Sequence, residues 1–135
     1  MNRELILKLI ERAQSSAGNA YCPYTNAPVG CSLLVDDNII FGGCNVENNV
    51  LSCSACAGEV AVLKAISEGY TTFRAVCFWM SGMTRLPYPS GKTLQIFSEF
   101  SSTKKLNIIC ANERTYETFA LGDLLPCPPE NTVIE

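Results

Sequence analysis

Histidine is absent from this 135-residue sequence, and that absence restricts the chemistry available to the chain. Without histidine there is no Ser-His-Asp triad, no HExxH metal site and no imidazole to act as a general acid or base near neutral pH. Any reaction must therefore depend on Cys, Asp, Glu, Lys, Tyr or a bound metal.

Charged residues and long apolar runs are also scarce. Only 17% of the residues are charged and the net charge is -3, which argues against nucleic acid as a partner. No apolar run approaches the roughly 18 residues of a membrane span. Met1–Glu4 leads into a charged amphipathic segment rather than the apolar core of a signal peptide. We therefore expect a cytoplasmic protein whose eight cysteines are reduced.

The sequence does contain enough apolar residues, 47% of the chain, to bury one core, and we expect a single domain over residues 1–135. Hydrophobic periodicity and capping residues predict helices over 4–17, 57–68, 91–100 and 121–125. Apolar runs predict strands over 29–35, 39–44, 75–80 and 106–111. Strands that alternate with helices predict an α/β domain whose sheet is at least partly parallel.

Two stretches of the chain carry a family resemblance. The first is Tyr21-Cys22-Pro23-Tyr24 with Val29-Gly30, and the second is Gly43-Cys44-Asn45-Val46-Glu47-Asn48 followed by Cys56-Ala57 and by Lys64 to Tyr70. Together with Leu124-Leu125-Pro126 they resemble the small homotetrameric zinc-dependent cytidine deaminases of pyrimidine salvage, which act on free nucleosides. The resemblance implies a three-layer α/β/α domain with a mixed central sheet.

The resemblance implies the chemistry of that family. Three cysteine thiolates hold zinc, and a glutamate moves protons while the activated water attacks C4 of cytosine. On an ungapped alignment Cys56 matches the first zinc ligand, but Ser90 and Thr93 occupy the positions of the other two cysteines. Gly58 occupies the position of the glutamate. Glu59 follows one residue later, rotated by about 100° around a helix. We therefore expect no bound zinc and no other cofactor.

The family's substrate contacts are partly preserved on the same alignment. Asn45 and Glu47 match the pair that hydrogen-bonds the ribose. Three positions where the family places aromatic residues hold Ala27, Leu51 and Pro129 instead. Loss of stacking partners costs roughly 1 to 3 kcal/mol each, so nucleoside affinity should fall.

Several of these residues also have simpler interpretations. Asn45 and Glu47 could stabilise a turn, and Ser90-Gly91-Lys92-Thr93 resembles the end of a phosphate-binding loop but is explained more simply by a helix that begins with Ser90 as its cap. Cys53 and Cys56 form a CxxC that lacks a second thiol pair. Most of the remaining cysteines, and the aromatic pair Phe78-Trp79, are expected in the core.

Three hypotheses for function follow. The first is a catalytically inactive member of the family that serves as a structural or regulatory subunit, assembling with itself or with an active deaminase paralogue. The second is a protein that binds a pyrimidine nucleoside without turnover through Asn45 and Glu47. The third is an active deaminase that uses Glu59 and a rebuilt zinc site including Cys53 and Cys56.

Overall fold

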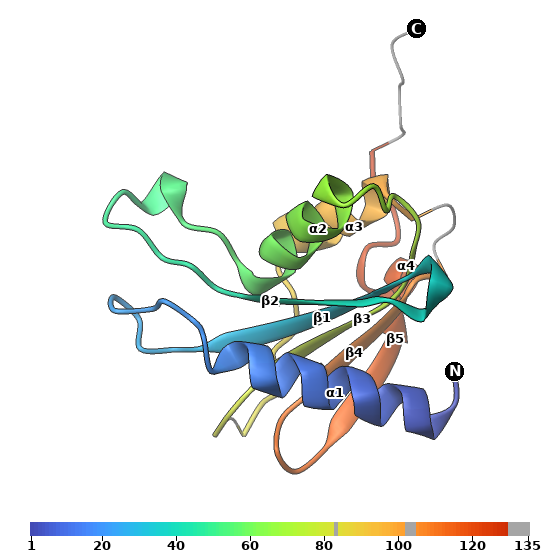
Figure 1. The fold of residues 1–135 in the computed structure, drawn as a ribbon, viewed down its shortest axis with the longest axis horizontal. Helices are drawn as coiled ribbons and strands as arrows, with labels where there is room; N and C mark the ends of the chain where they lie inside the picture. The colour runs from blue at the N-terminus through green and yellow to red at the C-terminus, as the bar shows by residue number, and fades with distance from the viewer. Residues whose placement is uncertain (83, 102–104, 130–135) are drawn as a thin grey trace, which may run out of the picture.

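A computed structural model describes residues 1–82, 84–101 and 105–129. Helix α1 spans Arg3–Ala17, and two shorter helices, α2 and α3, span Ala57–Ser67 and Gly91–Glu99. A four-residue helix, α4, spans Leu121–Leu124 (Figure 1). The strands are β1 Val29–Val35, β2 Ile40–Cys44, β3 Phe73–Met80, β4 Asn107–Ala111 and β5 Tyr116–Ala120.

The five strands form one mixed sheet in the order β2-β1-β3-β4-β5. Among the strands of the described residues, only β3 and β4 pair in parallel, and α3 lies in the crossover that joins them. The remaining neighbours are antiparallel, with β1 paired to both β2 and β3. This is the partly parallel sheet that the sequence predicts, and its central strands are short apolar runs covered on both faces.

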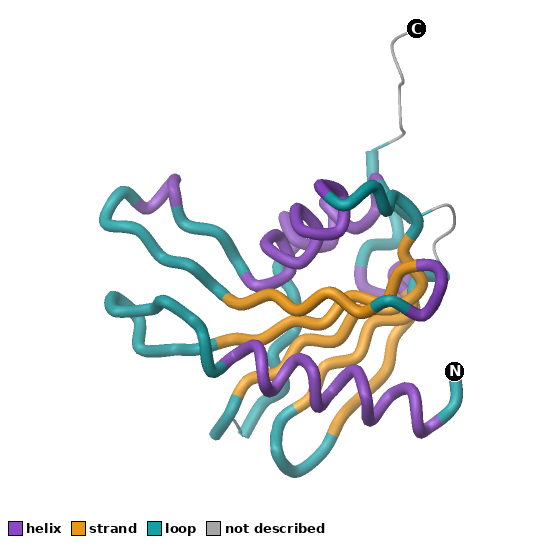
Figure 2. Tube along the Cα trace, in the orientation of Figure 1, coloured by secondary structure: helices purple, strands orange, loops and turns teal. Residues whose placement is uncertain are grey.

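Helices cover the sheet on its two sides. Helix α1 packs against one face, while α2 and α3 lie together on the opposite face (Figures 1 and 2). Each face has its own apolar core: Leu9 and Trp79 belong to the one under α1, and Phe78 and Phe97 belong to the one under α2 and α3. The domain therefore has the three-layer α/β/α architecture that the resemblance implies.

Two glycines allow the helices to lie close to the sheet. A Cβ on Gly30 would stand 1.7 Å from the carbonyl oxygen of Ala13 in α1. On the other face, a Cβ on Gly43 would stand 2.6 Å from the carbonyl oxygen of Ala57 in α2. Because glycine has no side chain, α1 can pack closely against the strand at Gly30, and the start of α2 can pack closely against the strand at Gly43.

One element, β5, is missing from the sequence-based prediction. Its residues are Tyr116, Glu117, Thr118, Phe119 and Ala120, of which none is buried and two are exposed. As an edge strand it pairs with β4 alone and needs no apolar run, so hydrophobicity did not reveal it. The other predicted helices and strands are present, and their ends differ by no more than two residues.

Among the described residues, no helix combines the length and apolar character that a bilayer crossing requires.

Candidate functional site

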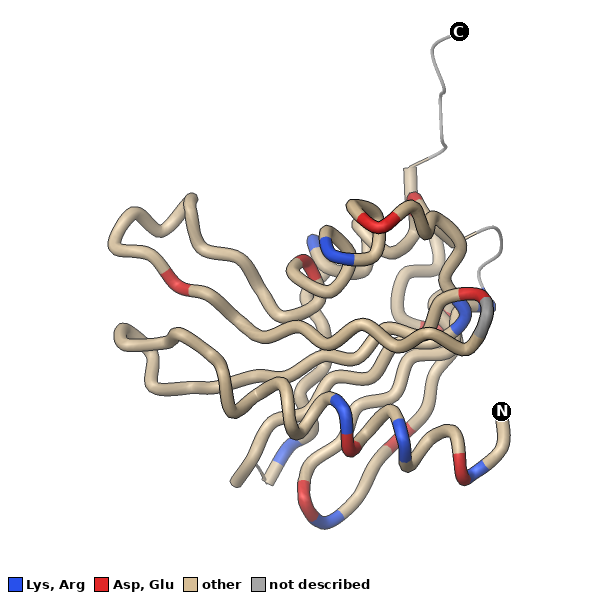
Figure 3. Tube along the Cα trace, in the orientation of Figure 1, with Lys and Arg blue, Asp and Glu red and all other residues tan. Residues whose placement is uncertain are grey.

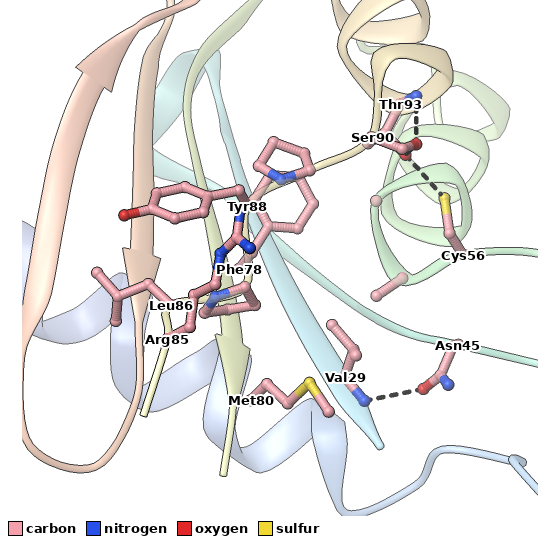
Figure 4. Close-up of a pocket in the computed structure, with 14 residues that line it drawn as sticks. Val29, Asn45, Cys56, Phe78, Met80, Arg85, Leu86, Tyr88, Ser90 and Thr93 are labelled. Atoms are coloured by element: carbon pink, nitrogen blue, oxygen red, sulfur yellow. Dashed lines mark hydrogen bonds between the residues drawn. The ribbon is translucent and has the colours of Figure 1, made fainter. Parts of the chain in front are cut away.

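The beginnings of two helices meet at the site that the sequence predicts. Cys56 is the N-cap of α2, and Ser90 is the N-cap of α3, where its hydroxyl accepts a hydrogen bond from the Thr93 backbone N–H. The Cys56 Sγ lies 3.3 Å from Thr93 Oγ1, which lies 3.2 Å from Ser90 Oγ (Figure 4). Ser90 and Thr93, which follow Cys56 by 34 and 37 residues in the sequence, thus lie next to Cys56, as the ungapped alignment requires.

Gly58 lies in the first turn of α2, beside this group, and a side chain there would force its neighbours to shift. A Cβ at Gly58 would stand 2.9 Å from both Phe78 Cε1 and Thr93 Cγ2, and 3.1 Å from Phe97 Cε2. Phe78 and Phe97 pack edge to face with their ring centroids 6.1 Å apart. The position that the resemblance assigns to the family's glutamate is therefore closely surrounded by Phe78, Phe97 and Thr93.

Glu59 and Cys53, two of the three residues of the rebuilt-site hypothesis, do not line the cavity of about 530 Å³ to which Cys56 and Gly58 contribute. Glu59 borders a smaller hollow of about 300 Å³, which it shares with Glu47 and Lys92 and which also reaches Cys56 and Thr93. Cys53 is exposed at the end of a short 3-10 turn over Leu51–Cys53. Among the described residues, no group of three or more Cys, Asp or Glu side chains could hold a metal ion.

Asn45 and Glu47 have their side chains in hydrogen bonds within the chain. The Asn45 amide accepts from the Val29 N–H at 2.9 Å and donates to the Ala27 carbonyl at 3.0 Å. The Glu47 carboxylate accepts from the Thr25 hydroxyl at 2.6 Å and from two backbone N–H groups. The hydrogen bond from the Thr25 hydroxyl is the main cause that lowers the pKa of Glu47. Both residues therefore order the two loops that follow α1 and β2.

A cavity of about 530 Å³ opens in front of the two helix starts, within the usual size range of small-molecule sites. Cys56, Gly58, Ser90 and Thr93 lie on one side, Asn45 is at the edge, and the 85–89 segment forms the opposite wall (Figure 4). Phe78, expected only as a core residue, also lines this cavity.

Arg85 and Tyr88 are cavity residues that the sequence reasoning missed. The Arg85 guanidinium lies 5.7 Å from the centroid of the Tyr88 ring. The Tyr88 hydroxyl donates to Glu117 on β5 at 3.1 Å, which fixes the ring against that strand. The Gly/Pro-rich composition of this segment indicates a loop, and it gives no sign that the loop would form a wall of the site.

The donor set at the helix starts does not fit the zinc ion that the resemblance implies. Structural and catalytic zinc sites use three or four thiolate, imidazole or carboxylate ligands. Here one thiol, that of Cys56, faces the neutral hydroxyls of Ser90 and Thr93, and none of the described residues that line the main cavity carries a carboxylate. Neutral hydroxyls compete poorly with thiolates for zinc, so we derive no step through a metal.

The eight cysteines are free, and they fall into distinct environments. Cys31, Cys77 and Cys110 are buried on the three central strands, as expected of small apolar residues. Burial raises the pKa of Cys110 to about 12 and also raises the pKa of Cys31 and Cys77. Cys127 is exposed and Cys22 and Cys44 are half-buried, so full burial accounts for three of these six cysteines and not for most of them.

Comparison with known proteins gives one family. Residues 3–127 match the family described as "Cytidine and deoxycytidylate deaminase zinc-binding region". A cytidine deaminase of Sporosarcina psychrophila is 38% identical over 120 residues, covering 88% of this chain and 87% of that protein. A probable cytidine deaminase of Dictyostelium discoideum is 36% identical and covers 93% of this chain and 84% of its own length.

A solved structure agrees with the sequence relatives. The crystal structure of cytidine deaminase from Burkholderia pseudomallei is 30% identical, with a TM-score of 0.85, and the match covers 95% of this chain and 99% of that one. The similarity thus extends over nearly the whole fold as well as the sequence. This chain belongs to the cytidine and deoxycytidylate deaminase family.

Proposed function

We propose that this chain is a non-catalytic member of the family, which acts as a structural or regulatory subunit of an oligomer. The observation that carries the proposal is that position 58 holds a glycine closely surrounded by other side chains. The family's reaction needs a carboxylate there, and in this chain the space for even a Cβ is occupied by Phe78, Phe97 and Thr93. Removal of a general acid-base group costs on the order of 10²- to 10⁴-fold in rate.

The donor set supports the same proposal. Two hydroxyls stand where the family has thiolates, so the ion that activates water would lack two ligands. Glu59 shares the smaller hollow with Cys56, Ser90 and Thr93, but it does not line the cavity beside Gly58, the position that the resemblance assigns to the glutamate. An active deaminase with a rebuilt site therefore has little support.

Binding of a pyrimidine nucleoside without turnover is the second candidate function. The cavity of about 530 Å³ at the family's site favours it, since a purely structural subunit has no need of such a space. Asn45 lies at its edge, although the Asn45 amide already makes two hydrogen bonds. This candidate is compatible with a regulatory role.

Elemental analysis of the purified protein, combined with an ultraviolet assay for loss of cytidine, tests the main proposal. We expect less than 0.1 zinc per chain after dialysis, and no conversion of cytidine or deoxycytidine when zinc is supplied. A cytidine deaminase of the family, assayed in parallel, is the positive control. About one zinc per chain with saturable formation of uridine would refute the proposal.

A further inference from the structure

Strand β2 forms one edge of the sheet, and part of its backbone faces away from the other strands. Among the described strands, β2 pairs with β1 alone (Figure 1). The Val35 N–H donates to the Ile39 carbonyl at 3.0 Å, and along an antiparallel pair the residues that bond across alternate with residues that face outward. This register directs the N–H and C=O groups of three β2 residues outward: Ile40, Gly42 and Cys44.

The outward groups of this edge are complementary to those of a second copy. If two β2 strands pair in the antiparallel direction about a two-fold axis at Gly42, Ile40 of each copy lies opposite Cys44 of the other. Every outward donor then meets an outward acceptor. None of the residues in β2 is charged, so the strand itself places no like charges opposite each other. An edge with these properties favours edge-to-edge pairing.

A lysine side chain occupies the centre of the edge. The Nζ of Lys64, on α2, donates to the Gly42 carbonyl. Lys64 also lines a hollow of about 340 Å³ with Phe41 and Tyr70, whose ring centroids are 5.7 Å apart. The ammonium group is therefore held at the backbone group on which the two-fold pairing is centred.

This position of Lys64 opposes the pairing in two ways. The ammonium group takes up the acceptor that a second strand needs at Gly42. Pairing would also bring two ammonium groups, one from each copy, to the two-fold axis, where like charges repel. Arg12 adds a second cation from α1, since its Nε would stand 2.8 Å from a Cβ at Gly42. Gly42 is buried even though it belongs to an edge strand, which agrees with this cover.

We propose that Lys64 keeps the β2 edge closed to strand addition by a second copy of this chain. Lysines at sheet edges are a recurrent protection against such pairing, and here the lysine is bonded to the edge itself. The inference goes beyond the proposed function, because it concerns the backbone of β2 and involves neither zinc nor a nucleoside. Removal of the ammonium group should open the edge to self-association.

Three substitutions test this role by light scattering. Lys64→Met removes the ammonium group and keeps an apolar stem beside Phe41 and Tyr70. We expect its mass at about 100 μM to be at least twice that of the parent, because each two-fold contact joins two assemblies. Lys64→Arg keeps a charged donor and should retain the parent's mass. The matched control is Lys8→Met, at a side chain 62% exposed on α1, which should also retain it.

Amide hydrogen exchange locates the contact. In concentrated Lys64→Met, the outward N–H groups of Ile40, Gly42 and Cys44 should exchange about tenfold more slowly than in a dilute sample, because pairing gives them acceptors. The parent should show no such dependence on concentration. A variant that only lost stability would instead exchange faster at both concentrations, so this measurement separates the two effects.

A folded Lys64→Met that keeps the parent's mass would overturn the inference. Association without slower exchange at β2, or equal association of Lys64→Arg, would also overturn it. If circular dichroism shows that Lys64→Met does not fold, Lys64→Gln removes the same charge and carries the same expected results. The proposed function is judged separately, by zinc content and deamination of the parent, so failure of one is distinguishable from failure of the other.

Discussion

Gly58 occupies the position that the resemblance assigns to the proton-moving glutamate, and its surroundings make a larger side chain there difficult to accommodate. A Cβ there meets Phe78, Thr93 and Phe97 at 2.9 to 3.1 Å. We expect Gly58→Ala to lower the free energy of unfolding by about 1 to 3 kcal/mol, because overpacking outweighs the better helix propensity of alanine. Urea denaturation followed by circular dichroism measures the change.

Gly91 provides the matched control for that substitution. It begins α3, and a Cβ there meets no atom within 4 Å. Gly91→Ala should leave stability unchanged or raise it by up to about 1 kcal/mol. Equal effects of the two alanines would show that Gly58 is not confined by its neighbours.

The positions of Ser90 and Thr93 predict that two substitutions can rebuild a zinc site. Sulfurs that bind one tetrahedral zinc ion at about 2.3 Å lie roughly 3.8 Å apart, close to the 3.3 Å between Cys56 Sγ and Thr93 Oγ1. We expect Ser90→Cys with Thr93→Cys to take up about one zinc per chain. Elemental analysis and the thiolate-to-cobalt absorption of the Co²⁺ form measure uptake.

The control for the zinc site is Cys56→Ser in the same double variant, which should lose the metal. If the double variant folds and binds no more zinc than the parent, the three side chains are not arranged as ligands. Adding Gly58→Glu is a separate step. Thr93→Cys removes one of the three atoms that a Cβ at position 58 would meet, but Phe78 and Phe97 remain.

Sequence alone predicts the meeting of Cys56, Thr93 and Ser90, because a gap-free alignment fixes positions along the helices. It does not predict what fills the space beside them. The edges of Phe78 and Phe97 close position 58 from β3 and α3, and such tertiary packing leaves no local signal. Arg85 likewise gains its place only when its loop folds over the cavity.

At the scale of elements, the sequence predicts best where burial leaves a pattern. Strands β1, β3 and β4 are mostly apolar and mostly buried, as expected for a sheet that helices cover on both sides. Strand β5 is the exception, since it lies at the edge and mixes exposed with half-buried residues. Its place is set by backbone pairing with β4, which any sequence of suitable conformation can make.

The thiols on the three central strands predict a loss of stability at alkaline pH. Burial raises the pKa of Cys31, Cys77 and Cys110, whereas an unfolded thiol ionises near pH 8.5. The neutral thiols therefore stabilise the fold fully below about pH 8.5, and this contribution is lost as pH rises. Three thiols give a slope of roughly 4 kcal/mol per pH unit once the unfolded thiols are ionised.

Urea denaturation between pH 7.5 and 9.5, under reducing conditions, measures this slope. Cys77→Ala should reduce the slope by about one third, because one of the three raised pKa values is removed. A free energy of unfolding that stays constant across this range would contradict the prediction.

At the scale of the whole molecule, apolar side chains gather at one end. The loops around residues 19–28 and 45–56 project beyond the sheet, and charged residues are few along them (Figures 1 and 3). Tyr21, Tyr24, Val50 and Leu51 are each more than half exposed there. Clustered apolar residues of this kind are typical of protein interfaces, and they are consistent with an oligomeric subunit.

Leu51 lies shortly before helix α2 and Leu63 lies on it. Substitutions at these two leucines test whether the chain assembles with itself. Leu51 is 82% exposed before α2 and Leu63 is 60% exposed on it, so each would be poorly placed in a monomer. We expect a tetramer, with a mass about four times 14.7 kDa by light scattering at micromolar concentration. Leu51→Glu and Leu63→Glu should shift that mass towards the monomer, because a buried unpaired carboxylate is strongly unfavourable.

The control is Leu7→Glu, at a residue 47% exposed on α1 across the sheet, which should leave the assembly intact. A parent chain that is monomeric, or a tetramer that tolerates both Leu51→Glu and Leu63→Glu, would exclude this end of the molecule as the interface.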